Sequence, residues 1–528
     1  GYQQLEGEIG RIIMILRSLN VRAVTHSGVD FLGTFYEAFL RYGYDNNSLG
    51  IVFTPRHITR FCVDLLDVDH NDRVVDLACG TGGFLVSALD RMVATAPREA
   101  SKNKIRSSLS GYDPNPTVWA LAVLNMYFRG DGKSHINRAS SLTARARSEV
   151  RQRFTKAFLN PPFSQDDEPE RQFIDASMAA CEPGGRLAVV VKAGIFADGE
   201  HKAWRGEFTR RHTVQAVISL PEDLFYPTAA PTSIMIAKAH VPQLESGEVY
   251  LARVSNDGFT KLKGKRVERP GGELADIVAA YRKAQAGSAV MDERSVTVPG
   301  STLLGGAEWS PQEWLPQPHV ENTAVEHQRV LLAGSILRAV AQYPELAELV
   351  MTNLGSDRGS TPLPYGSGLL PLSDLFEVQN GRSSGEKNYL EGDVPYVSSG
   401  DLSNSIVGLV HPVPGELFST GAITVTAFGQ AFVQPWPFMA RGNGGSSVRV
   451  LIPRFRMSFR ELLWFASQLN LQRWRFFYAR MAIKSRIVRL KVEVPTAAIP
   501  DERTGFHASI SGFLGSFRLQ RRTISGVD

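Results

Sequence analysis

The 528-residue chain has few cysteines and lacks any long apolar segment. Cys62, Cys79 and Cys181 lie far apart and have no Cys or His neighbours at metal-ligand spacing. This argues against a zinc site or a disulfide framework and favours a reducing, cytoplasmic environment. No apolar run approaches the roughly 18 residues that cross a bilayer, and no signal peptide is visible at Gly1, although a start without Met makes that weak evidence. We therefore expect neither a membrane segment nor a bound metal.

The sequence also lacks internal repeats, low-complexity tracts and a large net charge. Hydrophobic residues make up 43% and charged residues 21% of the chain, which is typical of globular proteins, and the length predicts two or three domains. The formal charge of +5 is unevenly distributed, because Trp436 to Asp528 holds 16 Lys and Arg against five Asp and Glu. A basic C-terminal region favours a polyanion-facing module, although a solvated arginine-rich surface explains it equally well.

Hydrophobic periodicity divides the chain into five segments. Apolar residues at helical spacing predict an N-terminal helical region over 1–48, and alternating short strands and helices predict a parallel α/β domain over 49–300. A helical linker over 301–369, with a helix from Ala324 to Met351, precedes a domain of short strands over 370–500 and a tail over 501–528. The strands predicted in the α/β domain are Val74–Leu77, Leu109–Tyr112, Ala157–Leu159, Leu187–Val191, Val214–Ser219 and Ser233–Ala237.

A glycine-rich turn follows the first of these strands. Val74–Leu77 runs into Gly80, Thr81 and Gly82, and a helix is predicted to open at Phe84. Glycines let the backbone pass close to a ligand at the carboxyl end of the first strand, where open α/β sheets bind cofactors. Taken alone, the turn also fits a dinucleotide site or a strand–helix turn without a ligand.

Asp113 lies at the tip of the second predicted strand. A carboxylate there is placed to accept hydrogen bonds from ribose hydroxyls. Asp113 follows Asp76 by 37 residues, which is further than the roughly 20 of a dinucleotide fingerprint. By itself, Asp113 suits a helix N-cap equally well.

Asn160-Pro161-Pro162-Phe163 directly follows the strand Ala157–Leu159. Alone it fits a rigid turn, but together with the glycine turn it resembles the amino-methyltransferases of DNA, most closely the modification subunits of type I restriction systems. The order of the two motifs resembles the gamma arrangement of that family. Leu220-Pro221 through Thr232 resembles its late strand, and the likeness spans about residues 25–290.

This resemblance implies a Rossmann-like sheet that binds S-adenosylmethionine and methylates the N6 amino group of adenine. It implies catalytic roles for Asn160, Pro161, Pro162 and Phe163. The residues that it assigns to the cofactor are Phe53, Thr54, Pro55, Asp76, Ala78, Gly80, Thr81, Gly82, Asp113 and Ser140.

The chemistry gives the catalytic motif a physical reason. The adenine amino group is a poor nucleophile because its lone pair is delocalised into the ring. The Asn160 amide oxygen and the Pro161 carbonyl can accept both N6 hydrogens, and two prolines hold these acceptors in place beforehand. Phe163 offers a face on which an extruded base can stack. Methyl transfer then requires positioning, with no metal and no covalent enzyme intermediate.

Three positions depart from the pattern or are ambiguous. Ser140 stands where the family usually has an acid after the third strand, which is consistent with weaker cofactor binding. Cys79 lies in the cofactor turn but has no partner His, so we do not expect a catalytic thiol. Phe225 or Tyr226 is a candidate second wall for the base, although core packing explains either residue more simply.

The segment Leu372–Pro495 resembles a target-recognition domain of type I specificity subunits. The matching stretches are Leu375–Gly381, Gly392–Ser399, Gly421–Thr426 and the arginine-rich helix with the following strand, Arg486–Pro495. Arginine suits both phosphates and guanine edges, and the aromatic-rich helix near Phe459–Tyr478 is expected to pack in a core. The DNA-contact candidates are Arg441, Arg449, Arg473, Arg475 and Arg480.

Three functions remain open at this stage. The first is a self-contained DNA adenine-N6 methyltransferase of a restriction or phage-defence system, with double-stranded DNA as substrate and a restriction endonuclease or another defence subunit as partner. A single recognition module fits a homodimer on a two-fold site or a monomer on an asymmetric one. The second is a methyltransferase of RNA or protein. The third is a DNA-binding subunit with a degenerate methyltransferase fold.

Overall fold

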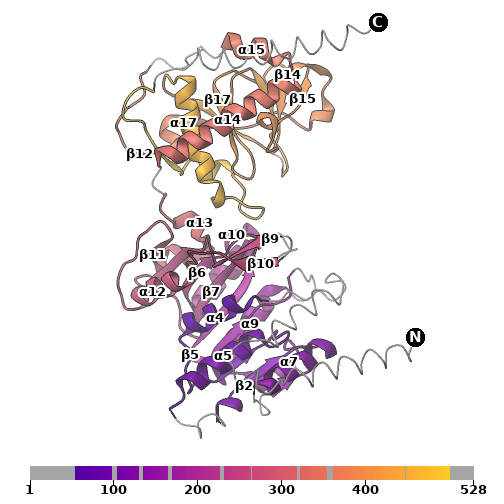
Figure 1. The fold of residues 1–528 in the computed structure, drawn as a ribbon, viewed down its shortest axis with the longest axis vertical. Helices are drawn as coiled ribbons and strands as arrows, with labels where there is room; N and C mark the ends of the chain where they lie inside the picture. Colours follow the sequence, from indigo (N-terminus) through magenta and orange to yellow (C-terminus); the bar gives the residue numbers. More distant parts are fainter. Residues whose placement is uncertain are drawn as a thin grey trace, which may run out of the picture. The chain divides into compact units, whose positions relative to one another are not determined.

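The computed structural model describes nine segments of the chain. They are residues 54–97, 104–129, 135–163, 169–225, 231–262, 265–317, 321–353, 361–445 and 447–499. The chain forms two compact units, one up to Pro316 and the other from Gln317 onward, and each is described by itself (Figure 1). The predicted N-terminal helices over 1–48, Phe53, Tyr226 and the tail 501–528 lie outside the described residues.

The first unit is built on a nine-stranded sheet with the order β11-β8-β6-β7-β5-β4-β1-β2-β3. All six predicted strands are present in it. The strands are β1 (Val74–Asp76), β2 (Leu109–Tyr112), β3 (His135–Asn137), β4 (Phe154–Leu159), β5 (Cys181–Lys192), β6 (Thr213–Ser219), β7 (Thr232–Lys238), β8 (Glu248–Arg253) and β11 (Ser295–Pro299). A separate hairpin pairs β9 (Phe259–Leu262) with β10 (Lys265–Glu268).

The sheet is mixed, which corrects the prediction of an all-parallel one. β7 lies between β5 and β6 and runs antiparallel to both, and β11 runs antiparallel to β8. Parallel neighbours need a long crossover, usually a helix, whereas the described part of the β6–β7 connection contains only a turn at 222–225. Strands β1 to β5 do run parallel, so the ends of β1, β2 and β4 meet at one edge of the sheet.

Helices cover both faces of this sheet. Helices α4, α5 and α12 share one apolar core with the central strands, whereas α9 packs on β4 and β5 (Figure 1). The helices of this unit are α4 (Arg56–Leu66), α5 (Gly83–Thr95), α7 (Pro116–Phe128), α8 (Ala144–Val150), α9 (Glu170–Ala180), α10 (Gly194–Ala197), η1 (Gly199–His201), α11 (Lys202–Arg211), α12 (Leu274–Gln285), η2 (Gly300–Gly306) and α13 (Pro311–Trp314).

The second unit contains two four-stranded sheets and a pair of strands. Their orders are β13-β20-β17-β18, β15-β14-β19-β16 and β12-β21. The strands are β12 (Leu369–Pro371), β13 (Phe376–Asn380), β14 (Glu391–Val397), β15 (Ile406–Val410), β16 (Leu417–Phe418), β17 (Ala422–Val425), β18 (Ala431–Gln434), β19 (Phe438–Ala440), β20 (Arg449–Pro453) and β21 (Lys491–Glu493).

Two long helices complete the core of this unit. The helices are α14 (Asn322–Gln342), α15 (Leu346–Asn353), α16 (Leu372–Leu375), η3 (Glu386–Asn388), η4 (Ser403–Ser405), α17 (Phe459–Leu471), η5 (Arg473–Arg475) and α18 (Lys484–Ile487). A capping box of Ser458 and Glu461 starts α17, since the two side chains satisfy amide groups at the helix start. The apolar face of α17 then packs on the β13–β18 sheet.

Three segment boundaries differ from those predicted. The helix expected over Ala324–Met351 is two helices, because Pro344 cannot continue α14. The aromatic-rich helix ends at Leu471 rather than near Tyr478. The predicted linker 301–369 is divided between the units: α13 belongs to the first, whereas α14 packs on α17 inside the second.

Candidate functional site

The glycine turn after β1 adopts the conformation that its sequence favours. Gly80 and Gly82 have φ angles of 54° and 84°, in the left-handed region where glycine is least strained. The Cys79 amide donates to the Tyr112 carbonyl at 2.9 Å, and the Gly82 amide donates to the Cys79 carbonyl at 2.8 Å. The turn therefore lies against the end of β2, and α5 begins directly after it.

The predicted acids meet at this edge of the sheet. Asp76 is buried, and burial together with the nearby Asp113 charge raises the pKa of its carboxyl to about 7, although the Ala78 amide donates to Asp76 Oδ1 at 3.0 Å and lowers it. Burial also raises the pKa of the Asp113 carboxyl, although hydrogen bonds with the Asn115 and Gly80 amides lower it. Two carboxyls with raised pKa values beside an open turn suit a ligand that carries a positive charge and hydroxyl groups.

The remaining cofactor candidates border the same turn. The Thr81 carbonyl accepts a hydrogen bond from Asn125 Nδ2 at 3.1 Å. Ser140 Oγ accepts the Leu142 amide at 3.3 Å, so it is used in a local turn after β3. Its neighbour Ser141, which was not predicted, is buried and donates to the Leu77 carbonyl at 2.7 Å. Ser141 therefore ties the exit of β3 to the exit of β1.

Cys79 is not equipped as a nucleophile. Its side chain is buried, and burial and the charges of Asp76 and Asp113 raise the pKa of its thiol well above the usual value. A thiol that stays protonated is neither a nucleophile nor a good ligand. The structure gives Cys79 a packing role behind the turn, where it lies against Gly111.

Asn160 lies at the carboxyl end of β4 with its amide held from one side. Asn160 Nδ2 donates a 2.7 Å hydrogen bond to Thr54 Oγ1. Asn160 Oδ1 is buried and has no hydrogen-bond partner among the described residues. Thr54 and Pro55 directly precede α4, so the segment predicted to bind cofactor also orients the catalytic amide. An orphaned buried oxygen costs free energy, and a donor from a ligand would satisfy it.

Phe163 forms an aromatic corner beside this amide. Its ring meets Phe225 edge-on, with centroids 5.9 Å apart, and Lys192 Nζ lies 5.8 Å from its centroid. Pro161 is buried, whereas Pro162 and Phe163 remain partly exposed. Phe225 also packs in the core of the first unit, as the simpler of the two interpretations predicted, and its role as a wall for the base stays a prediction.

A buried polar cluster near α4 escaped the sequence analysis. His57 and Arg266 each contact Asp257, the first through a hydrogen bond and the second through an ion pair. The only local signals were the position of His57 three residues after Thr54 and an Asp-Gly turn at Asp257. Neither signal predicts that α4 and the β9–β10 hairpin are neighbours.

Two of the five arginines predicted to contact DNA are buried. Arg475 and Arg480 are 5% and 2% exposed, and Arg480 Nη1 donates to the Arg475 carbonyl at 2.6 Å. Arg475 lies over the Trp474 ring and Arg480 over that of Phe476. Their guanidinium groups serve packing, which corrects their assignment as DNA contacts.

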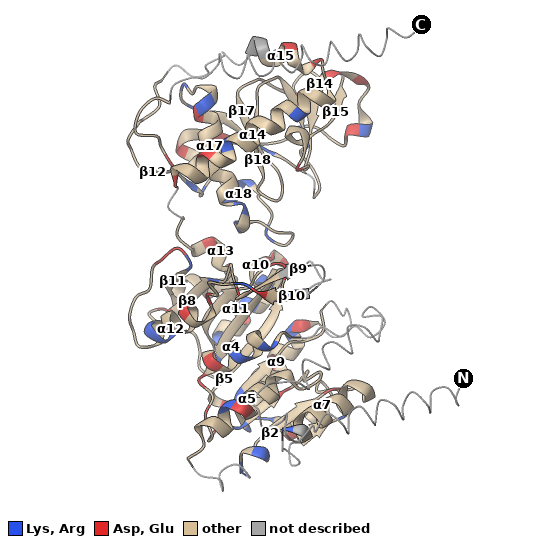
Figure 2. Cartoon of the chain, viewed as in Figure 1, with Lys and Arg blue, Asp and Glu red and all other residues tan. Residues whose placement is uncertain are grey.

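The other three candidates are more accessible. Arg473 is 43% exposed in its side chain and binds Asp401 and Gln430. Arg441 donates to the Asn443 carbonyl, and partial burial lowers the pKa of Arg449. Basic positions also lie at α18 (Figure 2).

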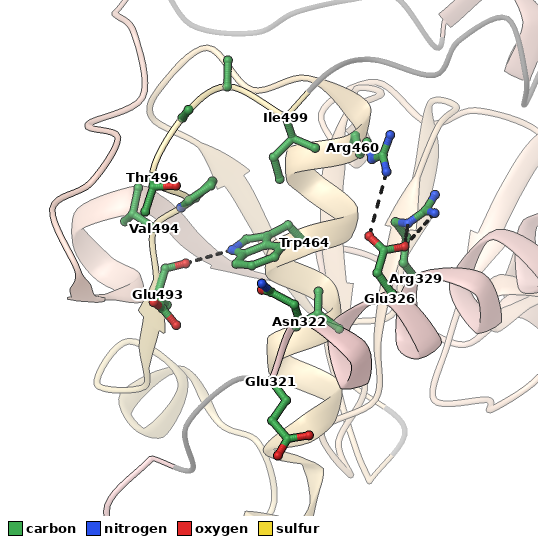
Figure 3. Close-up of a pocket in the computed structure, with 14 residues that line it drawn as sticks. Glu321, Asn322, Glu326, Arg329, Arg460, Trp464, Glu493, Val494, Thr496 and Ile499 are labelled. Carbon is green, nitrogen blue, oxygen red and sulfur yellow. Dashed lines mark hydrogen bonds and ion pairs between the residues drawn. The ribbon is translucent and has the colours of Figure 1, made fainter.

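One hollow of the second unit lies apart from these arginines. It has a volume of about 590 Å³ and lies between the start of α14, α17 and the segment after β21. Trp464 lines it and donates from Nε1 to the Glu493 carbonyl, whereas Glu326 pairs with Arg329 and Arg460 (Figure 3). Glu326, Arg329 and Arg460 are therefore paired with one another within the wall of the hollow.

The described segments also show what the first and second units lack. In these segments no helix has the length and apolar character needed to span a bilayer. Within the same segments, no three His, Cys, Asp or Glu side chains are grouped as metal ligands would be.

The fold and the site together define a methyltransferase-type α/β protein. Its glycine turn lies at the end of β1 and its Asn-Pro-Pro-Phe motif at the end of β4, at one edge of the sheet. The chain belongs to the N-6 DNA Methylase family, whose model matches residues 27–295, just over half of its length. This confirms the family predicted from the two motifs.

Similar proteins occur in restriction systems. The chain is 34% identical over 249 residues to the type II restriction enzyme and methyltransferase RM.BcgI of Heyndrickxia coagulans, covering 45% of this chain and 39% of that protein. It is 25% identical over 313 residues to the type I restriction enzyme MjaVIII methylase subunit of Methanocaldococcus jannaschii, covering 53% and 52%. The chain thus spans about half the length of these relatives or less.

Similar solved structures include methyltransferase subunits of type I restriction systems. The methyltransferase subunit of a type I restriction-modification system from Streptococcus thermophilus is 17% identical, with a TM-score of 0.39 over 48% of this chain and 56% of that one. The EcoKI M protein is 18% identical, with a TM-score of 0.37 over 45% and 54%.

Proposed function

We propose that this chain is a site-specific DNA methyltransferase that transfers a methyl group from S-adenosylmethionine to the N6 atom of adenine, in a restriction-modification or related phage-defence system. Family membership supports the reaction class. The observation that carries the proposal is the Asn160 amide, whose nitrogen is fixed by Thr54 while its buried oxygen has no partner in the described structure.

The motif suits an amine that must be made nucleophilic. Asn160 Oδ1 and the Pro161 carbonyl accept the two N6 hydrogens, which draws the nitrogen toward a tetrahedral geometry with its lone pair free. Fixed acceptors stabilise the positive charge that develops on nitrogen and need no reorganisation during the reaction. Phe163 and Phe225 meet at a right-angled corner, where an extruded adenine can stack.

The turn after β1 fits S-adenosylmethionine. A side-chain carbon added at Gly80 would meet no heavy atom within 4 Å, so the backbone borders open space. Asp76 and Asp113 supply carboxyls for the amino group and the ribose hydroxyls, and Ala78, Thr81 and Gly82 shape the turn. Bound there, S-adenosylmethionine supplies a methyl group on a positively charged sulfur.

The second unit is proposed to read the DNA sequence. Its support is the resemblance of Leu372–Pro495 to specificity-subunit domains and its excess of basic residues. Arg473 and Arg441 are the best-placed of the predicted arginines, because both are at least partly exposed, Arg473 in η5 and Arg441 just after β19. Such side chains position the duplex through phosphates or read base edges.

The proposal is tested by expressing the chain alone and sequencing the host DNA by a method that detects methylation. We expect N6-methyladenine confined to one short motif. Asn160→Ala should lower the methylation rate about a hundredfold or more, since it removes a fixed acceptor, while labelled S-adenosylmethionine still binds. Asn71→Ala, an exposed surface amide, is the matched control.

Other outcomes favour the alternatives. Cofactor binding without modified DNA would favour an RNA or protein substrate, or a missing partner subunit. Absence of cofactor binding in folded protein would favour a DNA-binding subunit with a degenerate fold. An Asn160→Ala enzyme with an unchanged rate would refute the mechanism.

A further inference from the structure

A partly buried hydrogen bond joins the first turn of α4 to the segment that leads into the β9–β10 hairpin. His57 Nε2 lies 2.8 Å from Asp257 Oδ2, and the Asp257 side chain is 1% exposed. The His57 ring also stacks on Phe259, with centroids 4.4 Å apart. The two partners are 200 residues apart in the chain, so this contact fixes the hairpin to a distant helix.

Arg266 extends the contact to a third segment. Its Nη2 atom donates to both Asp257 oxygens, at 2.8 Å and 2.6 Å. Its Nη1 atom donates to the Asp223 carbonyl at 3.2 Å and lies 3.5 Å from Asp223 Oδ1. One guanidinium therefore holds the hairpin to the segment that precedes Phe225.

Both ends of this chain of contacts reach the Asn160–Phe163 motif. His57 follows Thr54 by three residues, and Thr54 accepts the hydrogen bond from Asn160. Asp223 precedes Phe225 by two residues, and Phe225 packs edge-on against Phe163. Together with the motif itself, these contacts form a closed ring. The ring contacts the motif at two points, through Thr54, which accepts the bond from the amide, and through Phe225, the second aromatic wall.

The charge at the centre of the ring is well compensated. Burial raises the pKa of Asp257, but the hydrogen bond with His57 and the Arg266 guanidinium outweigh this and the net pKa is lowered. Asp257 is therefore ionised at neutral pH and keeps both partners. A buried charge that is fully paired restricts the groups around it to one arrangement, and removal of one partner is strongly unfavourable.

We propose that His57, Asp257 and Arg266 form a positioning cluster for methyl transfer, which holds the Thr54 acceptor and the Phe225 wall at the spacing that an extruded adenine requires. This inference rests on the proposed function, but none of the three residues is assigned to bind the cofactor or the base. Because a displacement of about 1 Å can cost a hundredfold in rate, a cluster outside the site can control the chemical step.

The test compares His57→Ala with His57→Gln. Glutamine keeps a side-chain N–H able to donate to Asp257, whereas alanine removes it. We expect His57→Ala to lower the single-turnover rate of tritium transfer from labelled S-adenosylmethionine to unmethylated plasmid DNA by about tenfold or more. The dissociation constant of the cofactor should change less than about twofold, and His57→Gln should recover part of the rate. Arg269→Ala, an exposed arginine just after the hairpin, is the control for Arg266→Ala.

A second measurement does not depend on activity. Hydrogen exchange of peptides covering 157–163 and 220–225 should be faster in His57→Ala and Arg266→Ala than in wild type and unchanged in Arg269→Ala. Unchanged exchange, or a wild-type transfer rate in His57→Ala, would overturn the inference. A rate loss matched by an equal loss of cofactor affinity would show a general structural role and would also overturn it. If wild type itself transfers no methyl group, the proposed function fails and the exchange data alone decide the inference.

Discussion

Asn160 and Thr54 are 106 residues apart in the chain, and a 2.7 Å hydrogen bond from Asn160 Nδ2 to Thr54 Oγ1 joins them. This bond decides which end of the amide is left without a partner among the described residues. With the nitrogen engaged, the oxygen remains as the acceptor. We therefore expect the segment before α4 to act in catalysis by orienting this side chain, in addition to its predicted contact with the cofactor.

Thr54→Val should slow methyl transfer by about fivefold, because one hydrogen bond of about 1 kcal/mol no longer fixes the amide. Thr54→Ser keeps the hydroxyl and should retain most of the rate. Single-turnover transfer at saturating cofactor measures the effect. Equal rates for the Val and Ser variants would contradict this role of the hydroxyl.

Cofactor binding should weaken as the pH falls below about 7. Burial raises the pKa of Asp76 to about 7, so the empty protein carries a partly protonated carboxyl at neutral pH. A cationic ligand favours the ionised form, so binding should release a proton and tighten as the pH rises. Calorimetry in two buffers of different ionisation enthalpy measures that proton.

Asp76→Asn provides the control for this titration. The variant should bind S-adenosylmethionine more weakly and with little pH dependence across neutrality. If Asp76→Asn kept the pH profile of the wild type, another group would be responsible for the titration. Asp113, whose pKa is also raised, is the first candidate.

Gly111→Ala should destabilise the first unit. A Cβ there would lie 2.8 Å from Leu85 Cδ1 and 3.0 Å from Cys79 Sγ, in a packed region behind the cofactor turn. Overpacking of this kind costs about 1–3 kcal/mol, which lowers the thermal midpoint. Gly199→Ala, where the new carbon meets nothing within 4 Å, is the matched control. Equal midpoints for the two variants would contradict the close packing.

The strands and motifs of the first unit were predictable because their signals are local. β4 is an apolar run that ends at Asn160-Pro161, and the turn after β1 requires glycine at Gly80 and Gly82. The antiparallel β7 was not predictable, since its apolar pattern is the same in either direction. The His57–Asp257 pair was also missed, because a contact across 200 residues leaves no periodic trace.

In the second unit, counting charged residues did not predict which arginines are exposed. Arginine was taken as a surface residue, but Arg475 and Arg480 are buried among aromatic rings and carbonyl oxygens. A guanidinium is flat and weakly hydrated, so it can pack on a ring while its N–H groups find acceptors. Sequence spacing does not distinguish that state from an exposed arginine.

Arg473 and Arg480 should therefore respond differently to truncation. Arg473→Ala removes a side chain that is 43% exposed, and we expect weaker DNA binding with a nearly unchanged thermal midpoint. Loss of one phosphate contact should also reduce the slope of the logarithm of the binding constant against the logarithm of the salt concentration by about one unit. Titration of plasmid DNA at several salt concentrations measures both effects.

Arg480→Ala should instead lower the stability of the second unit. Its guanidinium is buried, donates to the Arg475 carbonyl and lies over the Phe476 ring, so truncation leaves a cavity and an unsatisfied carbonyl. Such changes cost about 1–3 kcal/mol, measurable by denaturant unfolding. At a low temperature at which the variant is folded, the salt dependence of its DNA binding should match that of the wild type. A weaker salt dependence of DNA binding, together with wild-type stability, would indicate that Arg480 contacts DNA.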